Sequence, residues 1–259
     1  MDLLLGFNAV EAALKSGRRT VERVWIEKGH DRGRVVQLKA TARSHGVPVE
    51  EVDRVRIERL TGGQPRSAHQ GVVASAAALP YADPEDLLDA CGPEAVLMVL
   101  DGVEDPRNFG ALLRTAAAVG VSAVFIPERH SAGLSATAAR AAAGAAELIP
   151  VGRLGNVTAF LKLLKERGFW TVGLEASGAL PWDRFEYPSR WALVVGGEGQ
   201  GLRRLVRETC DQLVHIPLMG GLESLNVSVA AGICLYEAFR QSRVAGRGQE
   251  GGGGGIAPP

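Results

Sequence analysis

The chain has 259 residues, of which 46% are hydrophobic and 22% charged, and its 29 basic residues balance its 29 acidic ones. No apolar run reaches the roughly 18 residues that a membrane span needs, so no membrane partner is expected. The three cysteines are scattered without a C-x-x-C pair, which predicts neither a disulfide framework nor a metal site and favours a cytoplasmic protein. At about 150 residues per domain, the length suggests two domains.

The two parts of the chain differ in charge. Residues 1–76 carry 13 Lys and Arg against 9 Asp and Glu, whereas residues 77–246 carry 15 against 19. A basic N-terminal module beside a larger acidic one favours an anionic partner such as RNA for the small module. A surplus of four charges is also compatible with an ordinary solvated surface.

The first 76 residues alternate between helix and strand patterns. Helices are predicted at residues 6–17 and 33–46, where each helical pattern ends in a glycine. Strands are predicted where short apolar runs occur, at residues 21–29, 47–52 and 70–79. The pattern predicts a small α/β domain over residues 1–76.

The loop "TGGQPRSAHQ", residues 61–70, is rich in polar side chains. Arg66, His69 and Gln70 can contact phosphate or base edges, which makes them candidate RNA-binding residues. A plain exposed loop is an equally good interpretation.

The remainder of the chain has a different rhythm. Residues 77–91 are rich in Pro and Asp and are predicted to form a linker with a short helix. Over residues 92–244, Val-, Ile- and Leu-rich strands alternate with helices, which predicts a mostly parallel sheet with helices on both faces. Ligands bind such sheets at the carboxyl ends of the strands. The glycine-rich residues 245–259 are predicted to form a disordered tail.

The first loop at a strand end is "LDGVEDPRNFGALLRTA", and a helix is predicted to begin near Phe109. Asn108 stands at the entrance of this helix, where it either caps the helix or contacts a ligand. Arg114 is surrounded by Ala, Leu and Thr. Because an unpaired buried charge is very costly, a functional role for Arg114 is favoured.

The second loop is "VVGGEGQGL", residues 194–202. Its glycine spacing does not match the G-x-G-x-x-G dinucleotide fingerprint, and no Gly-Lys-Ser/Thr follows as in a P-loop. Four glycines around Glu198 predict a backbone held close to a ligand with one carboxylate displayed. Alternatively, Glu198 forms an ion pair with Arg203 or Arg204.

The third loop is "IPLMGGLESLNVSVAAGICLYEAF", in which a helix is predicted from the glycine pair to Phe239. Its buried face is predicted from apolar and small residues at steps of three and four: Leu225, Val229, Gly232, Ile233, Tyr236 and Phe239. Ser224 and Asn226 fall in the first turn of this predicted helix. They either cap the helix or contact a ligand that approaches the glycine backbone.

The three loops follow strands of one parallel sheet, so they can converge at one edge. Together they offer an arginine, a glutamate, a serine and two asparagines, but no metal-ligand cluster and no Ser-His-Asp set. Hydrolysis and redox chemistry are therefore poorly supported, and group transfer from a bound donor fits better.

The three loops together resemble motifs 1, 2 and 3 of the SpoU branch of the SPOUT methyltransferases, in the same order and spacing. The resembling segments are "DPRNFGALLRTA", "VVGGEGQGL" and "IPLMGGLESLNVSVAAGI". In addition, "GFNAVEAAL" and "HQGVVA" resemble the small RNA-binding domain of the bacterial enzymes that methylate a guanosine ribose in 23S ribosomal RNA. The resemblance covers most of the chain.

The resemblance implies an S-adenosylmethionine-dependent RNA 2′-O-ribose methyltransferase that acts on ribosomal RNA as a homodimer and contains a C-terminal trefoil knot. The implied catalytic residues are Asn108, Arg114, Glu198, Ser224 and Asn226. The implied donor-binding residues are Gly196, Gly197, Ile216, Leu218, Leu225 and Asn226. Arg107 joins the loop residues as a candidate RNA contact.

The chemistry limits what these residues can do. A guanidinium stays protonated with a pKa above about 12, so Arg114 is better suited to stabilising an alkoxide or a neighbouring phosphate than to acting as a base. Glu198 is expected to orient Arg114, and Asn226 to hold the ribose or the donor.

Other functions remain open at this point. Within the same fold, the target could be a tRNA ribose or another ribosomal nucleotide whose methylation confers antibiotic resistance. A ribosome-assembly protein without catalysis is disfavoured because all five polar motif positions are filled. A nicotinamide oxidoreductase lacks its fingerprint.

Overall fold

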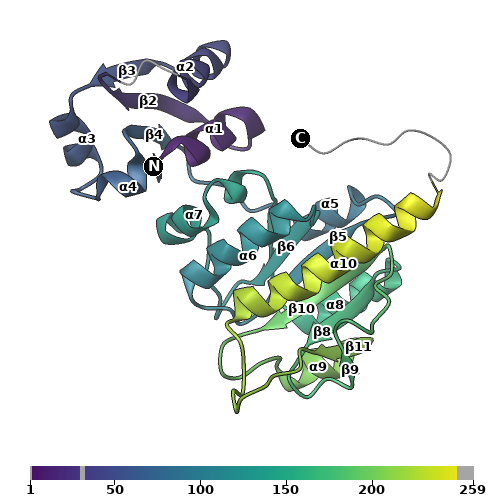
Figure 1. The fold of residues 1–259 in the computed structure, drawn as a ribbon. Helices are drawn as coiled ribbons and strands as arrows, with labels where there is room; N and C mark the ends of the chain where they lie inside the picture. Colours follow the sequence, from purple (N-terminus) through teal and green to yellow (C-terminus); the bar gives the residue numbers. More distant parts are fainter. Residues whose placement is uncertain (1, 30–32, 250–259) are drawn as a thin grey trace.

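The computed structural model describes residues 2–29 and 33–249. It contains a four-stranded sheet near the N-terminus and a seven-stranded sheet in the rest of the chain. Figure 1 shows the purple-to-blue N-terminal elements as one lobe and the teal-to-yellow elements as a second, larger lobe. The α/β architecture with a small N-terminal domain is therefore confirmed. Within the described part of the chain, no helix has the length and apolar character to cross a membrane.

The small sheet has the strand order β1-β4-β2-β3. Strand β4 pairs antiparallel with β1 and β2, and β3 pairs parallel with β2. The strands are β1 (Asp2–Leu5), β2 (Val21–Glu27), β3 (Val49–Val52) and β4 (Val72–Ala76). The helices are α1 (Phe7–Ser16), α2 (Arg34–Ser44), α3 (Arg54–Leu60) and α4 (Arg66–His69).

Three of these elements are not predicted from the sequence. Strand β1 has only four residues and runs directly into α1, which leaves too short a pattern to recognise. Helix α3 does have a start signal, because the Asp53 side chain accepts a hydrogen bond from the backbone N–H of Arg56. Helix α4 lies inside the segment predicted to be a loop.

The larger sheet has the strand order β7-β6-β5-β10-β8-β11-β9, and every pairing within it is parallel. Its strands are β5 (Val96–Asp101), β6 (Ala123–Pro127), β7 (Val151–Leu154), β8 (Trp170–Leu174), β9 (Leu180–Pro181), β10 (Trp191–Gly196) and β11 (Gln212–His215). All carboxyl ends therefore lie at one edge, as the sequence predicts.

Helices cover both faces of this sheet. One face packs against α6 (Pro106–Ala118), α7 (Ala136–Ala142), the short 3₁₀ helix η1 (Ala145–Glu147) and α10 (Val227–Gln249). The other face packs against α5 (Pro84–Asp89), α8 (Val157–Glu166) and α9 (Arg204–Thr209). Neighbouring β5 residues alternate between these two cores, as the pleat of a strand requires. The trefoil knot implied by the family resemblance stays a prediction.

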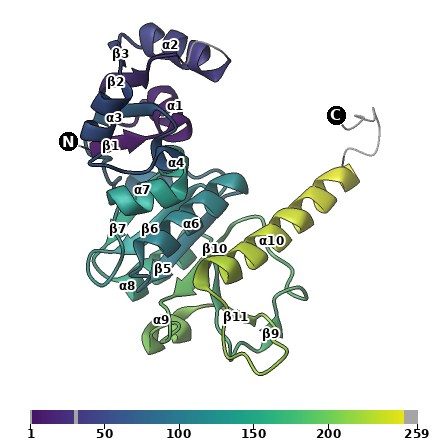
Figure 2. The same cartoon turned by 60° about the vertical axis from the view of Figure 1, so that its left-hand side comes forward.

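Helix α10 differs from its prediction at both ends. It begins at Val227, so Ser224 precedes the helix and does not lie in its first turn. It continues to Gln249, so residues 245–249 are helical and do not belong to a disordered tail; residues 250–259 lie outside the described part. Figure 2 shows the helix projecting beyond the sheet.

The buried face of α10 is also not the predicted one. The residues that pack into the core are Val227, Ala231, Cys234, Leu235 and Ala238. By contrast, Val229 and Tyr236 are 51% and 53% exposed, although their spacing predicted burial. Because α10 has apolar residues on two faces, their spacing alone does not predict which face packs into the core of the same chain.

Helices α6 and α7 pack unusually closely at Gly110. A Cβ atom placed at Gly110 would lie 2.5 Å from the Cβ of Ala141 and would overlap the carbonyl oxygen of Ala138. This contact matters for function because α6 also carries Asn108 and Arg114.

We predict that Gly110→Ala destabilises the protein, although alanine is the better helix former by about 1 kcal/mol. Overpacking against α7 should outweigh that gain and lower the free energy of unfolding by about 1–3 kcal/mol. Chemical denaturation measures the change. Gly92→Ala is the control, because a Cβ atom at Gly92 meets nothing within 4 Å. Equal stability of the Gly110 variant and the control would contradict the packing described here.

Candidate active site

A cavity of about 660 Å³ opens at the carboxyl ends of β8, β10 and β11. The three motif loops all contribute to it. Its lining includes nine of the residues expected at the site: Asn108, Gly196, Gly197, Glu198, Ile216, Leu218, Ser224, Leu225 and Asn226. Of the residues expected to act in catalysis or donor binding, Arg114 alone does not line it.

The glycine loop after β10 forms one wall, and its backbone at Gly196 and Gly197 is packed too tightly for a side chain. A Cβ atom at Gly196 would overlap the backbone of Gly201, and one at Gly197 would lie 2.9 Å from the carbonyl carbon of Gly102. The backbone N–H of Gly197 also donates to the carbonyl oxygen of Asp101 at 2.9 Å. These glycines let three backbone segments meet beside the cavity.

A chain of hydrogen bonds joins the three motifs across the cavity. The amide Nδ2 of Asn226 donates to Oδ1 of Asn108 at 3.0 Å, and Nδ2 of Asn108 donates to Oε1 of Glu198. At the start of α10, Asn226 Oδ1 accepts from the backbone N–H of Ser228 at 3.0 Å and from its hydroxyl at 2.6 Å. In this series of hydrogen bonds each side chain donates in the direction of Glu198. This direction suits an ionised carboxylate, which only accepts hydrogen bonds.

Asn226 therefore has two roles. It caps α10 through Oδ1 and orients Asn108 through Nδ2, so the predicted helix cap is confirmed, and contact with a ligand stays a prediction. Ser224 lines the cavity without capping the helix, because α10 begins only at Val227.

The cavity is acidic. Glu175, Glu198 and Glu223 line it, and no Lys or Arg occurs among its described lining residues. Glu175 was missed by sequence analysis, although it directly follows the predicted strand "WTVGL" and so lies at the same sheet edge. Its Oε2 accepts from the backbone N–H of Leu202 at 3.2 Å, which ties β8 to the glycine loop. Such a lining favours a cationic ligand.

The burial of Arg114 that its apolar neighbours suggest is wrong. Its side chain is exposed on α6, and within the described residues it has no hydrogen bond or ion pair. The carboxylate of Glu198 bonds to Asn108 and not to Arg114, which corrects the expected orienting role.

The alternative partners of Glu198 are also occupied elsewhere. Arg203 donates through Nε to Asp101 at 2.6 Å, and Arg204 pairs with Glu208 at 3.1 Å. The Asp101 side chain is fully buried, so this contact fixes the end of β5 to the start of α9. Glu198 therefore pairs with neither arginine and lines the cavity.

The candidate RNA-binding residues fall into two groups. His69 is only 2% exposed, and its Nδ1 accepts from the backbone N–H of Gly71, so it is not available to RNA in this structure. Burial lowers the pKa of this imidazole. Arg66 lies 3.4 Å from Glu27, and its side chain is 46% exposed. Gln70 and Arg107 are exposed.

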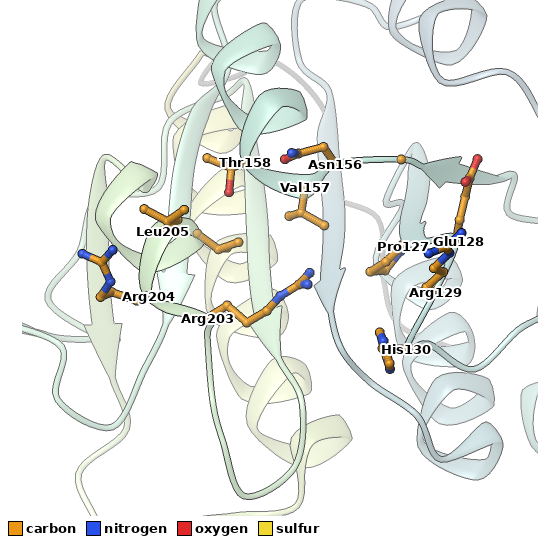
Figure 3. A pocket seen from close by; sticks show the side chains of 12 residues that line it. Pro127, Glu128, Arg129, His130, Asn156, Val157, Thr158, Arg203, Arg204 and Leu205 are labelled. Carbon is orange, nitrogen blue, oxygen red and sulfur yellow. The ribbon is translucent and has the colours of Figure 1, made fainter.

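A second cavity, of about 690 Å³, opens at the carboxyl ends of β6 and β7. Figure 3 shows Arg203 pointing into it from the start of α9, with Pro127 and His130 on the far side. Its lining includes three arginines, Arg129, Arg203 and Arg204, so it does not share the acidic character of the first cavity. In the described part of the chain, no three His, Cys, Asp or Glu residues are grouped to hold a metal ion.

Comparison with known proteins identifies the larger domain. Residues 95–236 match the model of the SpoU rRNA methylase family, and these residues carry all three motif loops. The chain belongs to the SpoU rRNA methylase family. Residues 3–82 match a second model, described as RNA 2′-O ribose methyltransferase substrate binding.

Curated relatives and solved structures agree with this membership. The chain is 43% identical to the 23S rRNA (guanosine-2′-O-)-methyltransferase RlmB of Ralstonia nicotianae, over 93% of this chain and 96% of that protein. It is 40% identical to RlmB of Salmonella typhimurium, over 93% and 98%. The AdoMet-bound rRNA methyltransferase of Sinorhizobium meliloti superposes with a TM-score of 0.75 at 27% identity, over 92% of this chain and 86% of that one.

We predict that Asn226→Ala lowers both stability and binding of S-adenosylmethionine, because one side chain caps α10 and organises the cavity. Losing the cap should cost about 1 kcal/mol of unfolding free energy. Asn156→Ala is the matched control: Asn156 caps α8 by accepting from Ala159 N–H at 3.0 Å and lies outside the acidic cavity. Calorimetric titration should show weaker binding for the Asn226 variant alone. Equal affinity of the two variants would contradict the double role.

Proposed function

We propose that this protein transfers a methyl group from S-adenosylmethionine to the 2′-hydroxyl of a guanosine ribose in 23S ribosomal RNA. The observation that carries the proposal is the hydrogen-bonded chain from Asn226 through Asn108 to Glu198, which joins all three family motifs at one cavity. The substrate is inferred from the RlmB relatives, which match over more than nine tenths of both chains.

The acidic cavity fits S-adenosylmethionine, which carries a sulfonium and an ammonium cation. Three carboxylates line the cavity without a neighbouring Lys or Arg among the described lining residues, an arrangement that attracts cations. The same lining would repel the pyrophosphate of a nicotinamide dinucleotide, which argues against an oxidoreductase. The volume also lies within the range of about 300–1,000 Å³ typical of small-molecule sites.

The cavity wall offers the donor both apolar and polar contacts. Ile216, Leu218 and Leu225 offer apolar contacts, and the open backbone of Gly196 and Gly197 allows close approach. Asn226 adds a polar group at the same wall. When bound, the donor supplies an electrophilic methyl group.

The residues of the chain then handle the ribose and its proton. Glu198 is held by Asn108, and its other carboxylate oxygen can accept a hydrogen bond from the 2′-hydroxyl. As the oxygen–carbon bond forms and the carbon–sulfur bond breaks, the hydroxyl proton passes to this carboxylate. Arg114 stays protonated and stabilises negative charge on the ribose oxygen or a flanking phosphate. Most of the rate enhancement comes from holding the two substrates in line.

A homodimer accounts for the position of Arg114. The exposed apolar face of α10 and Thr115 of α6 line a shallow groove of about 460 Å³, together with Ser228, Val229, Gly232, Ile233 and Tyr236. A second copy of the chain covering this groove would bury the exposed face. Because Arg114 directly precedes Thr115, it would then stand at the subunit interface. An arginine outside its own cavity can act at the partner's cavity in such a dimer.

The small N-terminal domain favours ribosomal RNA over tRNA as the substrate. It carries the basic surplus of the chain and matches the substrate-binding model of RNA ribose methyltransferases. Arg66 and Gln70 of this domain remain proposed RNA contacts, together with Arg107 of α6 and the motif loops of the larger domain. Since its relatives act on bacterial ribosomal RNA, we expect this protein to work in the cytoplasm. No metal ion is part of the proposed mechanism.

We predict that Arg114→Ala and Glu198→Gln each lower turnover on unmodified 23S ribosomal RNA by about 100-fold or more, because each removes a group that acts in the transition state. Methyl-labelled donor measures the turnover, and calorimetry should show donor affinity changed far less. Arg140→Ala, which removes an exposed charge from neighbouring α7, is the control. Turnover within about tenfold of the unsubstituted protein would remove the substituted residue from the mechanism.

We predict that Tyr236→Glu converts the dimer into a monomer, because a carboxylate would be buried in an apolar interface. Sedimentation velocity measures the change in mass. Val36→Glu is the control: Val36 is an apolar residue of similar exposure, 52%, but lies on α2 of the small domain. A Tyr236→Glu protein that remains dimeric would show that the partner does not bind over α10.

A further inference from the structure

The two domains are joined by a buried ion pair that the family motifs do not include. Arg19 lies just before β2 in the small domain, and Glu147 ends η1 in the larger domain. Both side chains are only 2% exposed. Arg19 donates to Glu147 Oε2 through Nε at 3.1 Å and to Oε1 through its terminal nitrogen, which is the forked geometry that guanidinium and carboxylate groups favour.

The remaining donors of Arg19 are directed to its own side of the interface. Its other terminal nitrogen bonds Asp2 at 2.9 Å and the carbonyl oxygen of Ala77 at 3.1 Å. One guanidinium thus connects the first strand, the segment that leaves the small domain and the larger domain. A buried arginine with this many partners has one well-defined position.

Arg18 and α1 reinforce the same contact. Arg18 donates to the carbonyl oxygens of Ala146 at 3.0 Å and Ile149 at 2.7 Å, on either side of Glu147. A Cβ atom at Gly144 would lie 2.7 Å from the carbonyl oxygen of Asn8, so α1 and the segment before η1 are in direct backbone contact.

The segment that connects the two domains, residues 77–82, is held by hydrogen bonds at both of its ends. The backbone N–H of Ala77 donates to the carbonyl oxygen of Thr20, and that of Ala82 donates to Val151 at the edge strand β7, each at 2.9 Å. The Tyr81 hydroxyl accepts from the backbone N–H of Leu134 at 2.8 Å. Both ends of the segment are therefore fixed, one to each domain.

We propose that Arg19 and Glu147 are positioning residues that hold the substrate-binding domain at a fixed orientation to the methylation site. Helix η1 follows α7, and both pack against α6, which carries Asn108 and Arg114. The ion pair thus fixes the position of the substrate-binding domain relative to α6, the helix that carries the site residues. The proposal rests on the proposed function for its substrate, but its geometry is independent of it.

A fixed orientation predicts a specific kinetic effect. RNA that touches both domains binds more tightly when the domains are already aligned, because no orientational freedom is lost on binding. Freeing the small domain should therefore raise the KM for RNA by about tenfold or more. The KM for the donor and the turnover at saturating RNA should stay within about threefold, because bound RNA itself realigns the domains.

The test uses two single variants of the full chain, Arg19→Met and Glu147→Gln, each of which removes the ion pair. Glutamine keeps the shape of Glu147, and methionine keeps an apolar stem at Arg19. Arg19→Lys retains the charge and should rescue part of the loss. Lys15→Met is the control: it removes a positive charge from the small domain, and among the described residues Lys15 pairs with the half-buried Glu11 of its own helix. Deleting the small domain is not an equivalent test, because it would remove the proposed RNA contacts together with the ion pair.

Small-angle X-ray scattering supplies the readout that does not depend on activity. Arg19→Met and Glu147→Gln should increase the radius of gyration while donor binding is unchanged. If Arg19→Met does not fold, the milder Glu147→Gln decides. An unchanged radius of gyration would overturn the proposal that the ion pair fixes the orientation of the two domains. Expanded scattering with an unchanged KM for RNA would overturn the positioning role. If the unsubstituted protein does not methylate ribosomal RNA, the proposed function fails. The scattering measurement still tests whether the ion pair fixes the orientation of the domains.

Discussion

The functional part of the structure depends on one steric constraint, the backbone contact around Gly196 and Gly197. At this point the end of β10 lies against the segment after β5 and against its own returning loop, with no space for a side chain. The contact sets the position of Glu198 and brings it within reach of Asn108 on α6. A larger residue at either glycine would separate the three segments and open the cavity wall.

Around this contact, the cavity combines rigid backbone with a polar chain of fixed direction. Asp101 and Arg203 fix one side of the glycine loop, and Glu175 fixes the other by accepting from Leu202 N–H. Asn226 and Asn108 then orient the carboxylate of Glu198. Preorganised groups of this kind contribute to catalysis because they need not rearrange during the reaction.

The sequence predicts the parallel sheet well because strands buried on both faces leave continuous apolar runs, such as those of β5 and β10. It also predicts most of the cavity lining, since loops that follow parallel strands must meet at one edge. It fails where burial depends on long-range packing. The exposure of Arg114, the burial of His69 and the choice of buried face on α10 cannot be obtained from spacing alone. Arg18 and Arg19 are missed because their partners lie more than 120 residues away.

The most direct test of the account is to identify the product of the reaction. Unmodified 23S ribosomal RNA is incubated with the protein and methyl-labelled S-adenosylmethionine, digested to nucleosides and separated by mass spectrometry. We predict that the label appears in 2′-O-methylguanosine. Label on a base, label in tRNA but not in ribosomal RNA, or no transfer at all would contradict it.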